Sequence, residues 1–248
     1  MTTNIIDTLN GVVASDSRWS IDYGNFIAYI DDSGYEKIAQ RPTAVIIFAG
    51  NGVLIDGWKA WFSQQVLDIE NHPDVERNIG GEDVSVTFFM LNVPSGEVEH
   101  SYGWIIPFED IRFAGSGAQA ALECFTTNKC PITAVRTASI KDPATGGVVR
   151  YYSTKTGENN LVADCATLAD AHNELWKRGF IMDKTTKQEF PASVLAASDA
   201  AGAVQAMKAM SLTAPAGPAL KWTDAAKANL KIALQKLADR EAAARAVN

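Results

Sequence analysis

The sequence predicts a layered α/β fold, in which mainly antiparallel sheets are covered by helices. Strand-like segments follow one another through short turns, and this order joins neighbouring strands as hairpins. Helix-like segments come in groups, and they do not alternate one by one with strands as they do in a parallel sheet. The chain has 248 residues, of which 47% are hydrophobic, so it is long enough to bury a substantial core.

The first half of the chain is predicted to consist mostly of strands. Asn10-Gly11 is a favoured turn between two apolar runs, which begin at Ile5 and Val12, and it predicts a β-hairpin. Between residues 53 and 69, large apolar side chains recur at helical spacing and predict a helix. Further strands are predicted at residues 26–30, 43–48 and 84–91, with two more within residues 97–114.

The second half mixes helices and strands before it becomes rich in alanine. Residues 181–248 are predicted to be an Ala-rich helical extension of a body formed by residues 1–180. Pro215 and Pro218 separate two helices within this extension, because proline interrupts a helix. The helices of this half are predicted at residues 117–127, 131–141, 166–178, 192–211 and 222–245, and its strands at residues 147–154 and 159–163.

Charge is distributed unevenly along the chain. The formal net charge is -7, but residues 191–248 carry seven Lys or Arg against four Asp or Glu, which leaves -10 for residues 1–190. The helix predicted at residues 222–245 has one apolar face, and this face needs a surface on the body or on a neighbouring subunit. Opposite charges on the two parts favour such docking.

The composition excludes several classes of protein. An acidic chain lacks the basic surface that neutralises nucleic-acid phosphates, and no apolar run approaches the roughly 18 residues that span a membrane. The N-terminal residues lack the basic and apolar regions of a signal peptide, so we expect a cytoplasmic protein. Three cysteines without CxxC spacing and three scattered histidines predict no metal centre.

One hydrolytic mechanism needs neither histidine nor cysteine. A threonine at a mature N-terminus carries its own base, because a free α-amine has an ordinary pKa of about 7.7–8.0. The amine accepts the hydroxyl proton while the threonine Oγ attacks a carbonyl carbon. Thr2 follows the initiator methionine, which a small second residue allows to be removed, and Thr3 is a competing candidate.

Several segments resemble, in order, the proteasome-like β subunits of the N-terminal nucleophile (Ntn) hydrolases, whose bacterial members include the HslV and Anbu types. Residues 12–18, VVASDSR, are similar to the end of the family's second strand. Lys37 precedes an apolar strand that ends in Ala-Gly at Gly50, and a helix is predicted after it, as in the family.

The resemblance continues to about residue 180. The sequence GSGA at Ser116 comes before a helix rich in small residues, as the family's Gly-Ser-Gly does. Asp142 begins the sequence DPATGG where family members have Asp-x-x-Ser-Gly-Gly, so Thr145 replaces a serine and keeps the hydroxyl. The first hairpin is about two residues shorter than in the family, which preserves the face on which each side chain lies. The resemblance implies an αββα sandwich of two mainly antiparallel sheets.

The resemblance also implies a role for each candidate residue. Thr2 would be the nucleophile, and its α-amine would be the proton acceptor. Asp16 and Lys37 would form a buried ion pair whose cation lowers the cost of the alkoxide. Gly50 would offer its backbone N–H to the oxyanion. The remaining candidates would hydrogen-bond around the α-amine and orient it: Ser116, Asp142 and Thr145.

These residues imply a threonine peptidase that uses no metal or organic cofactor and acts on peptides within a homo-oligomeric ring or spiral. Two other functions stay open: a catalytically silent assembly subunit that retains Met1, and an amidase of small molecules. Taken singly, each candidate also has an ordinary role. Asp16 and Asp142 suit turns, Lys37 suits a solvated surface, and Ser116 suits a helix N-cap.

Overall fold

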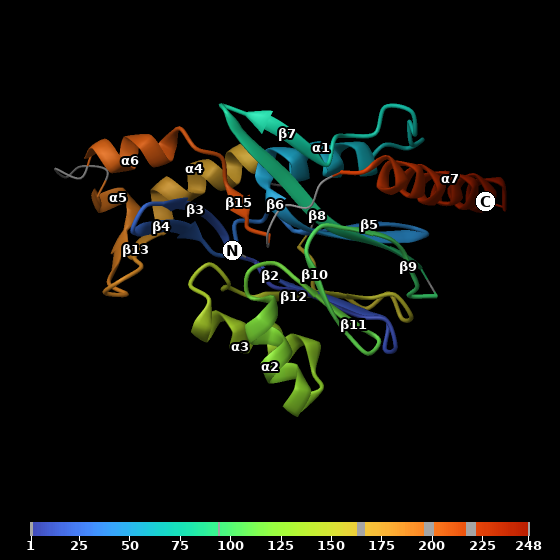
Figure 1. Cartoon of the computed structure of the whole chain (residues 1–248), viewed down its shortest axis with the longest axis horizontal. Helices are drawn as coiled ribbons and strands as arrows, with labels where there is room; N and C mark the ends of the chain where they lie inside the picture. Colours follow the sequence, from blue (N-terminus) through green and yellow to red (C-terminus); the bar gives the residue numbers. More distant parts are fainter. Residues whose placement is uncertain (1, 94, 163–166, 196–200, 217–221, 248) are drawn as a thin grey trace.

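The structure is a computed structural model that describes residues 2–93, 95–162, 167–195, 201–216 and 222–247. Within these residues the chain forms two antiparallel sheets and seven helices (Figure 1). The prediction of an α/β fold with mainly antiparallel sheets is therefore confirmed. Met1 lies outside the described residues, and so does Pro218.

The smaller sheet contains the predicted N-terminal hairpin. Asn4 pairs with Ser15 and Asp7 with Val12, so the two strands are in register along their whole length. The Asp7 carboxylate accepts hydrogen bonds from the backbone and side-chain nitrogens of Asn10, at 2.9 and 2.7 Å, and this closes the turn. The strand order is β10 (Ile105–Phe108), β11 (Ile111–Ala114), β1 (Asn4–Asp7), β2 (Val12–Asp16) and β12 (Val149–Ser153).

The larger sheet combines strands from the whole length of the chain. Its central strand β6 (Ala44–Asn51) carries no polar side chain before Asn51, because both faces of the strand are buried up to Gly50. Beside the main path, β5 (Ile38–Arg41) pairs with β6, and β9 (Val98–Tyr102) pairs with β8 (Glu82–Asn92). The main strand order is β14 (Glu189–Pro191), β13 (Phe180–Asp183), β4 (Phe26–Ile30), β3 (Trp19–Tyr23), β15 (Thr213–Ala214), β6 (Ala44–Asn51), β8 (Glu82–Asn92) and β7 (Glu76–Ile79).

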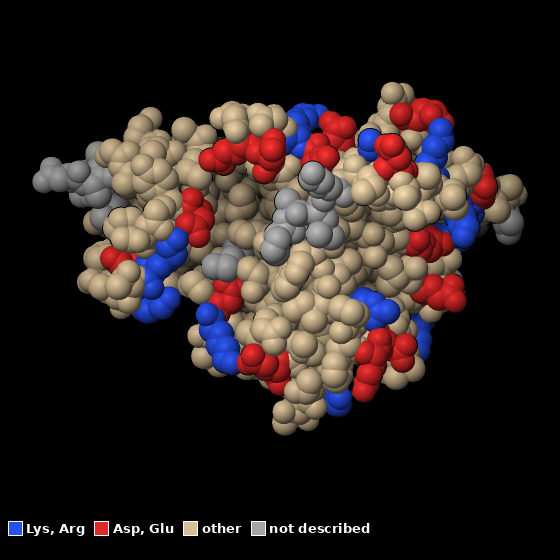
Figure 2. All heavy atoms as spheres, in the orientation of Figure 1, with Lys and Arg blue, Asp and Glu red and all other residues tan. Residues whose placement is uncertain are grey.

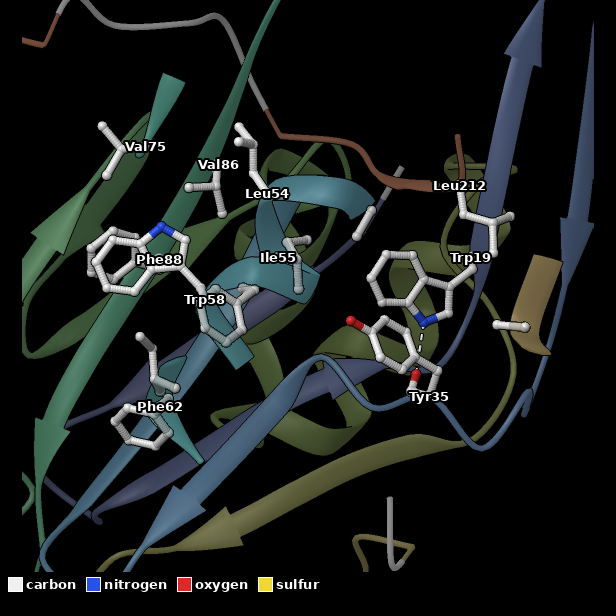
Figure 3. Packing of buried hydrophobic residues seen from close by; sticks show 14 of the residues in the cluster. Trp19, Tyr35, Leu54, Ile55, Trp58, Phe62, Val75, Val86, Phe88 and Leu212 are labelled. Atoms are coloured by element: carbon white, nitrogen blue, oxygen red, sulfur yellow. Dashed lines mark hydrogen bonds between the residues drawn. The ribbon is translucent and has the colours of Figure 1, made fainter. Parts of the chain in front are cut away.

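The alternation of side chains along the strands divides the core into layers. Ile5 packs under the helices beside the smaller sheet, whereas its neighbour Ile6 joins a cluster between the two sheets with Val45 and Ile47 of β6. The opposite face of β6 packs against helices on the far side of the larger sheet, around Trp58 (Figure 3). The helices are α1 (Gly52–Phe62), α2 (Ala118–Asn128), α3 (Pro131–Lys141), α4 (Leu168–Arg178), α5 (Ala192–Leu195), α6 (Ala201–Lys208) and α7 (Asp224–Val247).

Helices α2 and α3 contact the smaller sheet, and α1, α4 and α7 contact the larger one. Figure 1 shows this separation, with the green pair α2 and α3 on one side and the other helices on the opposite side. Local signals explain the helix ends. The Asn51 side chain accepts a 3.0 Å hydrogen bond from the Val53 N–H and caps α1, and Thr167 with Asp170 forms a capping box at α4.

The helix predicted at residues 53–69 is too long, because α1 ends at Phe62. Beyond this point the chain turns back against its own helix. The indole of Trp61 donates to the carbonyl of Asp68 at 2.7 Å, and the Arg41 guanidinium donates to the carbonyls of Phe62 and Gln64. These tertiary bonds satisfy carbonyl groups that a longer helix would have used.

The extension predicted to be helical at residues 181–248 also contributes most of β13 and all of β14 and β15 to the larger sheet, so it is not purely helical. Three further predicted elements differ from the structure. Residues 97–114 form three strands, not two. The strand predicted at residues 159–163 is reduced, among the described residues, to a bridge at Asn159, because the side chain of Asn160 takes over the pairing with Val149 and Tyr151. The helix predicted at residues 192–211 is present as α5 and α6, which ends at Lys208, and residues 196–200 lie outside the described part.

The end of the chain docks on its own body. The apolar face of α7 is buried in the core of the larger sheet at Leu230, Leu234 and Leu237. Lys231 and Arg240 form ion pairs with Glu residues of the body. In Figure 2, basic and acidic side chains are interspersed around α7. In the part of the chain described, no helix has both the length and the apolar character needed to cross a bilayer.

Candidate active site

Asp16 lies where the chain passes from one sheet to the other. It is the last residue of β2 in the smaller sheet, and the larger sheet begins three residues later at Trp19. The hairpin register continues beyond β1, since the Asp16 N–H donates to the carbonyl oxygen of Thr3 at 3.4 Å. Thr2 is therefore held beside the sheet junction, and its side chain reaches the carboxylate of Asp16.

Asp16 is buried, and its carboxylate accepts hydrogen bonds at both oxygens. A buried carboxylate is stable only when it is paired and hydrogen-bonded in this way. Five donors surround it: Thr2 Oγ1 at 3.0 Å and the Thr3 N–H at 2.8 Å on Oδ1, and Lys37 Nζ at 3.0 Å, the Arg18 N–H at 3.1 Å and the Gly146 N–H at 3.3 Å on Oδ2.

Lys37 contributes a buried cation to the same place. It precedes β5, and its carbonyl accepts a 2.9 Å hydrogen bond from the N–H of Phe48 in β6. Its Nζ donates both to Asp16 Oδ2 and to Thr2 Oγ1, and it lies 5.7 Å from the centre of the Trp19 ring. Burial lowers the pKa of the Lys37 ammonium, while the Asp16 carboxylate acts in the opposite direction.

A second hydrogen-bonded cluster lies next to the first. The Asp142 Oδ2 accepts bonds from Ser116 Oγ at 2.9 Å and from Thr145 Oγ1 at 2.8 Å. The Thr145 hydroxyl is also 2.8 Å from the hydroxyl of Thr3. The cluster therefore contacts Thr3, the residue that precedes β1. Gly117 is required here, since a Cβ at this position would lie 2.0 Å from the Thr3 hydroxyl oxygen.

Gly50 lies near the end of β6, immediately before the cap of α1. Its φ of +124° favours glycine, and an added Cβ would lie 2.4 Å from the backbone oxygen of Ser85 in β8. The Asn4 side chain ties this part of β6 to β1, because its Nδ2 donates to the carbonyl of Phe48 at 2.9 Å. This bond gives the buried amide of Asn4 a hydrogen-bond partner.

The structure thus brings Thr2, Asp16 and Lys37 into direct contact, and it gathers Ser116, Asp142 and Thr145 into the neighbouring cluster. Sequence reasoning gave no role to the Arg18 side chain. This guanidinium donates to both oxygens of Asp31, at 2.7 and 2.8 Å, and to the carbonyl of Pro143 at 2.6 Å, and so it fixes the loop that follows α3. Arg18 lies within the VVASDSR segment, but its partners Asp31 and Pro143 are distant in sequence, so the segment alone did not indicate them.

Thr2 and Thr3 are distinguished by their partners. The hydroxyl of Thr2 contacts the cation and the carboxylate of the ion pair, whereas the hydroxyl of Thr3 contacts another hydroxyl. Within the residues described, no three His, Cys, Asp or Glu side chains gather as metal ligands would. Comparisons of the chain with protein-family models and with curated proteins find no match.

Proposed function

We propose that the chain is a proteasome-like N-terminal threonine hydrolase that cleaves amide bonds in peptides. The observation that carries this proposal is the contact of one buried ammonium, Lys37 Nζ, with both the Thr2 hydroxyl and the Asp16 carboxylate. Burying an ion pair costs desolvation energy, so its position against a hydroxyl is difficult to explain by stability alone. A cation beside this oxygen stabilises the alkoxide form of Thr2.

The proposed reaction follows from these contacts. Once Met1 is removed, the α-amine of Thr2 accepts the proton of its own hydroxyl, and the Oγ attacks the substrate carbonyl carbon. The Gly50 N–H stabilises the resulting oxyanion. The amine then passes the proton to the leaving nitrogen as the C–N bond breaks. Water, deprotonated by the same amine, attacks the acyl ester, which releases the acid and regenerates Thr2.

The same proposal includes the αββα sandwich. Its support is the cluster that both sheets share, with helices packed on the opposite faces of the two sheets. Members of such a family assemble into rings or spirals, and we extend the proposal to a homo-oligomer. Light scattering coupled to size exclusion tests this part, and a strictly monomeric protein at all concentrations contradicts it.

The test begins with the intact mass of the purified protein, which shows whether one methionine has been lost. Hydrolysis of a fluorogenic peptide is then compared between the wild type and two variants. We expect Thr2→Ala to lose at least about 10³-fold in kcat and Thr2→Ser to retain measurable activity, because serine keeps the hydroxyl and the α-amine. Thr127→Ala, at an exposed position in α2, serves as the matched control.

Full activity of Thr2→Ala overturns the proposal. A retained Met1 combined with an absence of hydrolysis supports the catalytically silent assembly subunit, because the nitrogen of Thr2 then remains an amide. Activity on small amides without activity on peptides identifies the amidase.

A further inference from the structure

β15 occupies an unusual place for a strand of two residues. It lies between β3 and β6, and it joins the two halves of the larger sheet. Thr213 pairs with Ser20 on one side and with Asn51 on the other. Figure 1 shows β15 in this place between β3 and β6. Without β15, β3 and the end of β6 at Gly50 and Asn51 would be unpaired on the sides that face each other, and we call this gap the β3–β6 groove.

The backbone of β15 is directed at the candidate oxyanion donor. The Gly52 N–H donates to the carbonyl of Leu212 at 2.9 Å. Hydrogen-bonded and non-hydrogen-bonded pairs alternate in an antiparallel ladder, so the next hydrogen-bonded pair is Ala214 with Gly50. In this pair the Gly50 N–H faces the carbonyl oxygen of Ala214.

The segment also ends beside the candidate site. The Ser116 N–H donates to the carbonyl of Pro215 at 3.3 Å. Along the same edge of β6, the backbone of Lys37 pairs with Phe48, and Ala214 pairs with Gly50 two residues further on. Two residues of a strand span about 6.8 Å. Ala214 and the backbone of Lys37 therefore lie next to each other along this edge of β6, and the side chain of Lys37 contacts Thr2.

Most of the bonds that hold this segment use its main chain. The exceptions are the buried Leu212 side chain, which packs near Trp19 (Figure 3), and the Thr213 hydroxyl, which donates to the carbonyl of Ser20 at 3.0 Å. Main-chain pairing at strand edges accepts any extended peptide. Thr2 is fully buried, so a substrate reaches its hydroxyl only after a covering group moves.

We infer that residues 212–215 occupy, within the same chain, the site where an extended peptide binds, and that a substrate must displace them from the β3–β6 groove. This inference rests on the proposed function, but its ligand is defined by the groove: an unbranched peptide backbone that pairs with β3 and β6 and places a carbonyl at Gly50. The chain's own segment is tethered, and a short tether gives an effective concentration in the millimolar range. A free peptide therefore competes at a disadvantage.

The test weakens the segment in two steps. Thr213→Ala removes the hydroxyl bond to Ser20, and Thr213→Pro also removes the N–H that faces β3. Binding of a fluorescent, N-acetylated peptide of the sequence SLTAPA, which copies residues 211–216, is measured by anisotropy in a Thr2→Ala background. Catalysis then plays no part. We expect the peptide Kd to fall about tenfold in Thr213→Pro, with an intermediate decrease in Thr213→Ala.

Thr127→Ala in the same background is the control for the loss of a threonine side chain, and a scrambled peptide is the control for sequence-independent attraction. In the catalytic enzyme, Thr213→Pro should lower KM and leave kcat unchanged. The inference is overturned if the peptide Kd is the same with folded Thr213→Ala as with unchanged Thr213, and if Thr213→Pro leaves KM unchanged. This holds even if Thr2 proves to be the nucleophile. Conversely, tighter peptide binding without any Thr2-dependent hydrolysis supports the groove and contradicts the proposed activity.

Discussion

Replacing Asp16 by asparagine should destabilise the protein strongly, because it leaves the buried ammonium of Lys37 without its counter-charge. Both side chains of this pair are 1% exposed. Removing one partner of a buried pair costs about 3–5 kcal/mol, and for a chain of this size each kcal/mol lowers Tm by about 2–4 °C. We therefore expect Asp16→Asn to lower Tm by roughly 6–20 °C, and to lower the free energy of unfolding in urea by a matching amount.

The reverse change is expected to cost less. In Lys37→Met the Asp16 carboxylate keeps four donors, including the hydroxyl of Thr2 and the N–H of Thr3, so its charge remains solvated by the protein. The double variant should be more stable than Asp16→Asn alone, because it no longer contains an unpaired buried cation. Urea unfolding followed by tryptophan fluorescence measures all four proteins of this cycle.

Two results would refute this reasoning. One is a free energy of unfolding for Asp16→Asn within about 1 kcal/mol of the wild type. The other is a double variant whose loss of stability equals the sum of the two single losses, because the residues would then not be coupled.

Three further predictions concern the structure around the site. Burial lowers the pKa of His100 to about 4, so below pH 6.5 the unfolded chain binds a proton that the folded chain does not bind. This difference should lower the free energy of unfolding by about 3 kcal/mol between pH 7 and pH 4. Urea titrations at both pH values should show a smaller decrease in His100→Leu. Gly50→Ala should lower the free energy of unfolding by at least about 2 kcal/mol more than Gly24→Ala, measured by thermal unfolding. Both positions have positive φ, but only at Gly50 would the added Cβ lie 2.4 Å from a backbone oxygen. Equal losses of stability would contradict the close packing at Gly50. Leu234→Ala should lower the free energy of unfolding by about 2–5 kcal/mol, and Ile232→Ala, on the exposed side of α7, by less than about 0.5 kcal/mol. Similar losses for the two variants in urea unfolding would mean that α7 does not cover its own body in solution.

The hydrophobic pattern predicted the elements whose signals are local. The Asn10-Gly11 turn identified the first hairpin, Pro131 marks the start of α3, and the continuous apolar run before Gly50 identified the central strand. Short edge strands such as β5 and β7 were not predicted, because four residues carry too little periodicity to be recognised. Helix α1 was predicted too long because its end depends on tertiary hydrogen bonds from Arg41.

The candidate site shows the same division. Thr2, Asp16 and Lys37 were selected from the sequence by resemblance, and the structure brings them within hydrogen-bonding distance. The ladder between β1 and β2 brings Thr2 to Asp16, and the backbone pairing of Lys37 with Phe48 positions Lys37. The contact between Thr3 and Thr145 was not predicted, because it joins residues 142 positions apart.

Composition and local pattern were enough to recognise the acidic body, the basic, Ala-rich end and the predominance of strands in the first half. Two features became visible only in the folded chain: its end covers its own body, and Thr213 and Ala214 form a strand between β3 and β6. The physical reason is that local patterns report which face of a segment is apolar, whereas the partner of that face is chosen by long-range packing. A two-residue strand has no pattern at all, and its position exists only through the edges that it joins.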